Sequence, residues 1–162
     1  MSYGLGEWGL DEYGGYDRLH RFAVTQRNIF RDMEPIENAP AVLRKLSNLG
    51  IRIRIITNRL FLKYSHCTSI TQTVDWLDKY DIPYWDICFM NDKGAVGAHV
   101  YIDDTPDNIL NLRKLGCNTI IYTNSTNREL AGTRANNWAE VEKLVLEARE
   151  EWRTGTIGLF GI

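Results

Sequence analysis

The chain has 162 residues, 44% of them hydrophobic and 25% charged, with a formal net charge of −2 at pH 7. This composition is typical of a globular domain with a sizeable core, and it gives no electrostatic reason to expect nucleic acid or a membrane as a partner. Three widely spaced cysteines, no membrane-length apolar run and an N-terminus unlike a secretory signal favour a cytoplasmic protein without a disulfide framework or a zinc site.

Helical and alternating apolar patterns follow one another along the chain after its first fifteen residues. They predict helices over residues 16–33, 38–50, 69–80, 105–116 and 138–152. Asn38 and Thr105 are the expected N-caps of the second and fourth helices. The inward faces of the first three helices are expected to include Leu19, Phe22, Val42, Leu46, Leu49, Ile70 and Leu77, and that of the last helix is expected to include Val141 and Val145. Strands are predicted at residues 51–56, 86–90, 100–103 and 118–122.

Helices that alternate with short apolar strands indicate an α/β fold around a mostly parallel sheet, here in one domain over residues 1–162. Ligands of such folds bind where the carboxyl ends of the strands meet. The residues that follow each predicted strand are therefore the candidate site residues.

Three of these strand ends carry polar side chains suited to a phosphate or a cation. Thr57 and Asn58 follow the first strand, where a hydroxyl and main-chain N–H groups can hold phosphate oxygens, although both residue types are also common in plain turns. Lys93 follows the second strand and can neutralise a phosphate, or can be an ordinary solvated lysine. Asp103 and Asp104 end the third strand, where they can hold a divalent cation or cap the next helix.

A hydroxyl, a lysine and an acidic pair at one edge of a sheet are the groups that Mg²⁺-assisted phosphoryl transfer requires. Their order along this chain is threonine, lysine, acidic pair. Phosphate-accepting receiver domains use the same residue types, but there the acidic pair comes early and the lysine last. The sequence thus predicts an edge that binds phosphate and Mg²⁺.

This order resembles the haloacid dehalogenase (HAD) superfamily, whose motifs are matched by "RIIT", Lys93 and "YIDD". The stretches "HRFAVTQRNIF", "QTVDWLDKYDIPYWDICFMNDKG" and "TIIYTNSTNR" look like its 5'-nucleotidase/deoxyribonucleotidase group. The resemblance implies a three-layer, HAD-like Rossmannoid fold with a small helical cap. It also implies hydrolysis of nucleoside 5'-monophosphates through an aspartyl-phosphate, with Mg²⁺ as the cofactor.

The same resemblance divides the domain into a cap-like segment, residues 2–37, a Rossmannoid core, residues 38–152, and a C-terminal tail, residues 153–162. In the cap-like segment, Trp8 and Tyr16 can stack on a nucleobase and Arg27 can meet a phosphate or a base carbonyl, although packing inside the cap explains each of them as well. The expected partner is a nucleoside monophosphate or another small phosphate ester, and a homo-oligomer is left open.

The sequence departs from the family at one point. The family's first motif, an Asp-x-Asp that supplies the nucleophile and the general acid/base, occurs nowhere in these 162 residues. The N-terminal strand that carries this motif is also missing; in the family it lies at the centre of the sheet, between the strands predicted here at residues 51–56 and 100–103. One hypothesis is that the apolar segment "TIGLFGI", residues 156–162, fills that position.

Three explanations compete for this departure. The chain can start late within a longer protein, it can be a short form that binds phosphate, nucleotide or a partner protein without catalysis, or a separate polypeptide can supply the missing aspartates. We favour the first, a 5'-nucleotidase whose nucleophile-bearing segment is missing from this chain, and keep the second, a non-catalytic HAD-like module, as the alternative. In each case the chain by itself is expected to be inactive.

Overall fold

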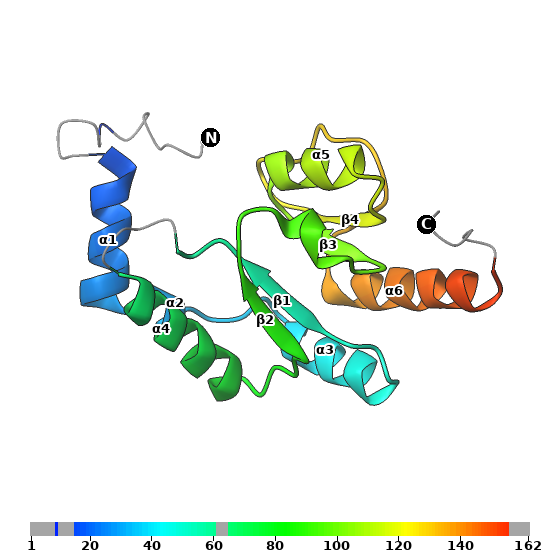
Figure 1. Ribbon diagram of the computed structural model, residues 1–162, viewed down its shortest axis with the longest axis horizontal. Helices are drawn as coiled ribbons and strands as arrows, with labels where there is room; N and C mark the ends of the chain where they lie inside the picture. The colour runs from blue at the N-terminus through cyan, green and yellow to red at the C-terminus, as the bar shows by residue number, and fades with distance from the viewer. Residues whose placement is uncertain (1–8, 10–14, 61–64, 156–162) are drawn as a thin grey trace. The chain divides into compact units, whose positions relative to one another are not determined.

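The computed structural model describes residues 9, 15–60 and 65–155 (Figure 1). The chain divides into two compact units, Met1–Lys93 and Gly94–Ile162. Each unit combines helices with strands that pair in parallel, which confirms the predicted α/β class and the parallel strand arrangement. No helix in the described part of the chain combines the length and the apolar character needed to cross a membrane.

The first unit contains a two-stranded parallel sheet. Strand β1 (Arg54–Thr57) pairs with β2 (Asp86–Phe89), and α4 (His66–Lys79) lies between them in the sequence (Figure 1). Arg54 and Asp86 face each other at the start of the pair, with Nη2 and Oδ2 2.7 Å apart. Both strands therefore end in register, so that Thr57 lies opposite Phe89.

Strand β1 is shorter at its start than predicted, because the preceding residues close a helix. Helix α3 (Ala39–Asn48) ends at Gly50, whose φ of 83° is a left-handed conformation that glycine adopts without strain. The N–H of Ile51 then donates to the carbonyl of Leu46 in the last turn. Ile51 thus belongs to the helix ending and not to the strand.

The helix predicted over residues 16–33 is wrong as one continuous element. It is two helices, α1 (Gly15–Arg27) and α2 (Ile29–Asp32), separated by Asn28 with a left-handed φ of 47°. Asparagine is one of the few non-glycine residues that adopt this conformation readily. The apolar spacing continues across the break, so periodicity alone gave no sign of it.

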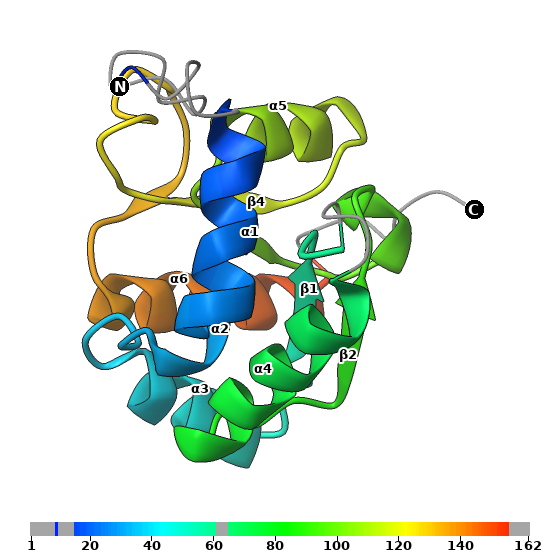
Figure 2. The ribbon, with the colours of Figure 1, turned by 90° about the vertical axis from the view of Figure 1, so that its left-hand side faces the viewer.

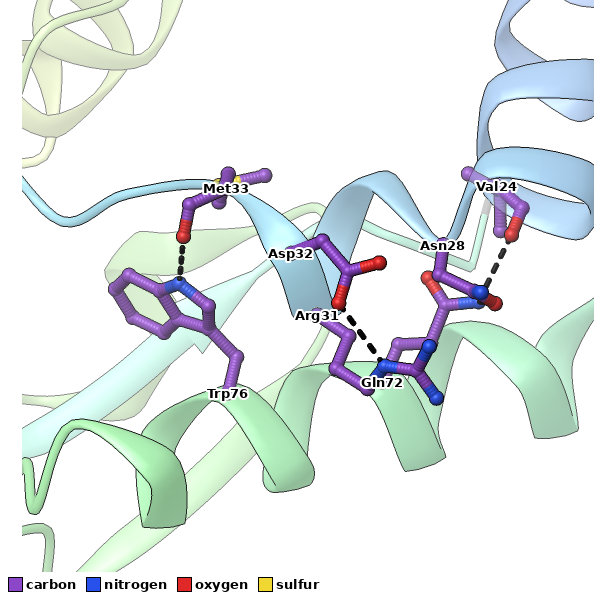
Figure 3. Close-up of polar contacts among 7 residues, drawn as sticks. All are labelled: Val24, Asn28, Arg31, Asp32, Met33, Gln72 and Trp76. Atoms are coloured by element: carbon purple, nitrogen blue, oxygen red, sulfur yellow. Dashed lines mark hydrogen bonds and ion pairs between the residues drawn. The ribbon is translucent and has the colours of Figure 1, made fainter.

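Side chains of α4 hold the broken segment in place. The Gln72 amide donates to the Val24 carbonyl at 2.8 Å and to Asn28 Oδ1 at 3.1 Å, and the Trp76 indole N–H donates to the Met33 carbonyl at 2.7 Å (Figure 3). Helix α2 accordingly packs along α4 in both ribbon views (Figures 1 and 2). These polar contacts explain why Gln72 is buried on this helix.

Several predicted inward positions are wrong. Ser69, Gln72 and Thr73 are buried on α4, whereas Ile70 is 36% exposed. Val24 is the buried residue of α1, whereas Leu19 and Phe22 are 40% and 47% exposed. Leu49, after α3, is also exposed. Asn38 does occupy the N-cap position of α3, but with a left-handed φ of 64° and without a side-chain capping bond.

The second unit contains a three-stranded parallel sheet. Strands β3 (Tyr101–Asp103), β4 (Thr119–Tyr122) and β5 (Arg134–Ala135) pair in that order, with α5 (Pro106–Lys114) between β3 and β4 and α6 (Trp138–Arg153) after β5. The apolar side chains of Ile109, Ile121 and Val141, contributed by α5, β4 and α6, are fully buried at its core. Strand β5 and the short 3₁₀ helix η3 (Lys93–Val96) were not predicted, because both are too short to show a period.

The sheets β1–β2 and β3–β4–β5 are separate among the strands that the structure describes. The hypothesis that "TIGLFGI" fills a position next to β1 and β3 stays a prediction, because residues 156–162 lie outside the described residues.

We expect Gln72→Ala to lower the free energy of unfolding by about 1–3 kcal/mol, because it leaves the buried Val24 carbonyl without the amide donor. Urea denaturation of the purified chain measures this change. Gln26→Ala is the matched control on the exposed side of α1 and should change the stability by less than about 0.5 kcal/mol. Equal effects of the two substitutions would contradict the anchoring role of Gln72.

Candidate functional site

The predicted residues Thr57, Asn58 and Lys93 all belong to the first unit and lie at the same end of its sheet. The Thr57 carbonyl accepts the N–H of Met90, at 3.0 Å, so the two strands stay paired to their carboxyl ends. Immediately beyond, Asn58 Nδ2 donates to Asn91 Oδ1 at 3.1 Å. Lys93 follows at the start of η3, with its own N–H bonded to the Asn91 carbonyl. We call Thr57, Asn58 and Lys93 the first-unit edge.

Arg59 adds a second cation next to this edge. Its guanidinium carbon lies 4.2 Å from the centre of the Phe30 ring, and Nη1 donates to Thr73 Oγ1 at 3.0 Å. Burial lowers the pKa of Arg59, but a guanidinium titrates so far above neutrality that it stays charged. Arg59 thereby connects the residues after β1 to α2 and α4. The sequence stretch "TNR" placed it at the strand end but gave no sign of these contacts.

The predicted acidic pair lies in the second unit, where Asp103 ends β3 and Asp104 begins the turn to α5. Asp103 is 8% exposed, and its Oδ1 accepts the main-chain N–H of Thr105 at 2.9 Å. The Asn108 amide also donates to Asp103, 3.1 Å from Oδ1 and 3.3 Å from Oδ2. Asp103 therefore stabilises the start of α5. Thr105 occupies the N-cap position as predicted, but its side chain makes no capping bond, so its expected capping role is wrong.

Asp104 differs from Asp103 because its side chain is exposed. Its Oδ2 accepts a hydrogen bond from the Asn124 amide at 3.1 Å, and its main-chain carbonyl accepts from Asn127 Nδ2 at 2.8 Å. We call Asp103 and Asp104 the second-unit turn. Asn108, Asn124 and Asn127 were missed by the sequence analysis, and the polar loop of "TIIYTNSTNR" was the only signal that could have found the last two.

The second-unit turn suits a hard divalent cation, which takes oxygen ligands from carboxylates, carbonyls and water. Within the described residues, however, no three His, Cys, Asp or Glu side chains gather closely enough to form a metal site by themselves. Two adjacent carboxylates fit Mg²⁺ in part, because this ion commonly binds one or two carboxylates together with water and substrate phosphate oxygens.

Two of the three predicted pocket residues of the cap-like segment, Tyr16 and Arg27, lie on α1 and make contacts within it. Tyr16 packs edge-on against His20, with ring centres 5.3 Å apart, and the Arg27 guanidinium lies 5.7 Å from the Phe22 ring centre. Burial lowers the pKa of His20; the charge of Asp17 acts in the opposite direction. The third pocket residue, Trp8, lies outside the described residues.

We expect Asp103→Ala to destabilise the chain by about 1–2 kcal/mol, because the start of α5 loses its carboxylate acceptor. Asp103→Asn should lose less, since an amide oxygen can still accept the N–H of Thr105. Thermal unfolding without added metal measures both variants. A larger loss for Asp103→Asn than for Asp103→Ala would show that the hydrogen bond to Thr105 is not what stabilises this turn.

Known proteins match this chain over most of its length. Residues 1–151 match the family model described as "5' nucleotidase, deoxy (Pyrimidine), cytosolic type C protein". A protein of Chlorobaculum tepidum named "Putative 5'(3')-deoxyribonucleotidase" is 52% identical over 145 residues, which cover 90% of this chain and 72% of the relative. The chain therefore belongs to the cytosolic type C family of 5'-nucleotidases, within the HAD-like group that its motifs resemble.

Proposed function

We propose that this chain carries the phosphate- and metal-binding residues of a HAD-type deoxyribonucleotidase, which hydrolyses (deoxy)nucleoside 5'-monophosphates. The observation that carries the proposal is the family match over residues 1–151, which includes every strand end with a predicted ligand. The name of the Chlorobaculum tepidum relative, which specifies 5'- and 3'-deoxyribonucleotides, supports the same substrate class.

In this proposal the first-unit edge binds the phosphate. The Thr57 hydroxyl and the Asn58 amide and main-chain N–H donate to phosphate oxygens, and the Lys93 ammonium compensates their negative charge. The hydrogen bond between Asn58 and Asn91 keeps this edge in one geometry before substrate arrives. Preformed donors are effective because they need no reorganisation during the reaction.

Asp103 and Asp104 would hold Mg²⁺. When bound, this ion would supply Lewis-acid stabilisation of the charge on a phosphate ester. The two aspartates differ in what they can offer. Asp103 already accepts bonds from Thr105 and Asn108, whereas Asp104 is exposed and can turn an oxygen to the cation.

Substrate selection is assigned to the cap-like segment, residues 2–37, in which Trp8, Tyr16 and Arg27 are the proposed base and phosphate contacts. The proposed location is the cytoplasm, in line with the free cysteines and the cytosolic type of the family.

The 162 residues contain no Asp-x-Asp, and therefore no candidate for the family's nucleophile. We propose that this chain alone binds phosphate and Mg²⁺ without hydrolysing nucleotides. This observation also favours the second candidate function, a non-catalytic HAD-like module that binds phosphate, nucleotide or a partner protein.

A phosphatase assay separates the two functions. It compares the 162-residue chain with a version extended at its N-terminus by the in-frame codons that precede Met1, using a panel of 5'- and 3'-deoxynucleoside monophosphates with and without Mg²⁺. We expect turnover only from the extended version. Binding without turnover in both versions would support the non-catalytic module, and robust turnover by the 162-residue chain would refute the missing-nucleophile interpretation.

We expect Lys93→Ala to weaken the binding of inorganic phosphate by roughly tenfold or more, because a charge-assisted hydrogen bond is worth about 1.5–3 kcal/mol. Calorimetric titration in the presence of Mg²⁺ measures this affinity. Lys79→Ala removes the same charge from the end of α4, where the ammonium lies against the Tyr80 ring, and serves as the control. Equal phosphate affinity in the wild type and Lys93→Ala would remove Lys93 from the site.

A further inference from the structure

The neutral amide of Asn124 contacts both the carboxylate and the main chain of Asp104, the exposed aspartate of the second-unit turn. Asn124 Nδ2 donates both to Asp104 Oδ2 and to the main-chain carbonyl of Asp104, each at 3.1 Å. We infer that Asn124 is a positioning residue: it fixes the Asp104 carboxylate in one rotamer, and so presents the other carboxylate oxygen to a divalent cation. The inference rests on the proposed metal-binding role of Asp104.

The orientation of the Asn124 amide follows from its other contacts. Asn124 Oδ1 accepts the main-chain N–H of Thr126 at 2.8 Å and the Thr126 hydroxyl at 2.9 Å. A main-chain N–H can only donate, so the amide oxygen must face Thr126. The amide nitrogen therefore faces Asp104, whose carboxylate and carbonyl oxygens can only accept.

One donor that bridges a carboxylate and the carbonyl of the same residue restricts the side-chain torsions between them. With Oδ2 engaged in this way, the one contact of Asp104 Oδ1 with the residues that the structure describes is a long one, 3.5 Å, with the Thr105 hydroxyl. Oδ1 is thus the oxygen left for a cation. Side chains that orient a metal ligand in this manner typically raise metal affinity by about 10–100-fold.

Asn124 is itself held by a buried network. Asn127 is 0% exposed, and its amide donates to the carbonyls of Asp104 and Tyr122, both at 2.8 Å. Its Oδ1 accepts the N–H of Asn124 at 3.1 Å and Arg134 Nη1 at 3.0 Å. The loop after β4 is therefore joined to β3 and β5 through one asparagine, and Asn124 is in position before any cation binds.

The lack of charge on Asn124 also affects how strongly Asp104 can attract a cation. A lysine or arginine at this place would hold Asp104 equally well, but would compensate its charge and repel an incoming cation. An amide donates the hydrogen bond and leaves the full carboxylate charge for the metal. This combination distinguishes a cation ligand from an aspartate that serves only in a surface ion pair.

The test compares the wild-type chain with Asn124→Ala and Asn124→Asp. The first readout is the set of NMR three-bond couplings that report the Asp104 side-chain rotamer without metal, and the second is a titration with MgCl₂ followed at the Asp104 amide. Asn124→Asp keeps an oxygen for Thr126, and so keeps the loop, but removes the donor to Asp104. Asn136→Ala is the control, because Asn136 bonds to Thr123 and Glu140 in the same unit.

We expect one Asp104 rotamer in the wild type and in Asn136→Ala, and averaged couplings in both Asn124 variants. We also expect Asn124→Ala to weaken Mg²⁺ binding by about tenfold. A single unchanged rotamer in Asn124→Asp, or unchanged Mg²⁺ affinity in Asn124→Ala, would overturn the inference. A wild-type chain that holds one Asp104 rotamer but shows no Mg²⁺ response would instead refute the proposed function, while the couplings still decide whether Asn124 positions Asp104.

Discussion

The hydrogen bond from the Thr105 N–H to the Asp103 carboxylate is the contact on which the candidate metal site depends. It joins the end of β3 to the start of α5, and under the proposed Mg²⁺ role this side chain would have two functions that compete for the same oxygens. A carboxylate has about four lone-pair positions. Thr105 and Asn108 already use part of them, which leaves Asp103 some capacity for a cation and makes its neighbour the more accessible ligand.

In the first unit, side-chain N–H groups are the donors for buried main-chain carbonyls. The broken segment α1–α2 brings main-chain carbonyls to the surface of α4, and buried carbonyls need donors. Gln72 and Trp76 supply them, so a face that would otherwise be apolar is polar. Asn58 and Asn91 form a similar amide pair at the strand ends. Side-chain amides thus connect neighbouring elements in both units.

The sequence predicted correctly most of the elements that are long or apolar. Apart from η3 and β5, the order of strands and helices from residue 39 to residue 153 follows the predicted one, and Val42, Leu46, Leu77, Val141 and Val145 are buried on the faces that their spacing indicated. Thr57 and Asp103 are the last residues of their strands, and Asn58, Lys93 and Asp104 come after strand ends, close to where the sequence placed them, because the end of an apolar run is easy to locate. Their roles as ligands stay predictions.

What the sequence could not supply depends on contacts between distant residues. The break at Asn28 is stabilised by Gln72, 44 positions further on, and apolar periodicity carries no information about such a partner. Asn124 and Asn127 looked like ordinary loop residues until the bonds to Asp104, about twenty positions earlier, were known. Strand β5 has two residues, and its extended conformation is stabilised by parallel pairing with β4. In each case tertiary contacts decided the local structure.

The way Asp104 is held has a consequence for the response to salt. Dissolved ions screen interactions between exposed charges beyond a Debye length of about 8 Å at physiological ionic strength, but they have little effect on short hydrogen bonds to neutral amides. Because Asn124 and Asn127 are uncharged, the geometry of Asp104 changes little with ionic strength. Salt would then weaken the proposed attraction between the carboxylates and a cation, and would leave the geometry of the proposed site unchanged.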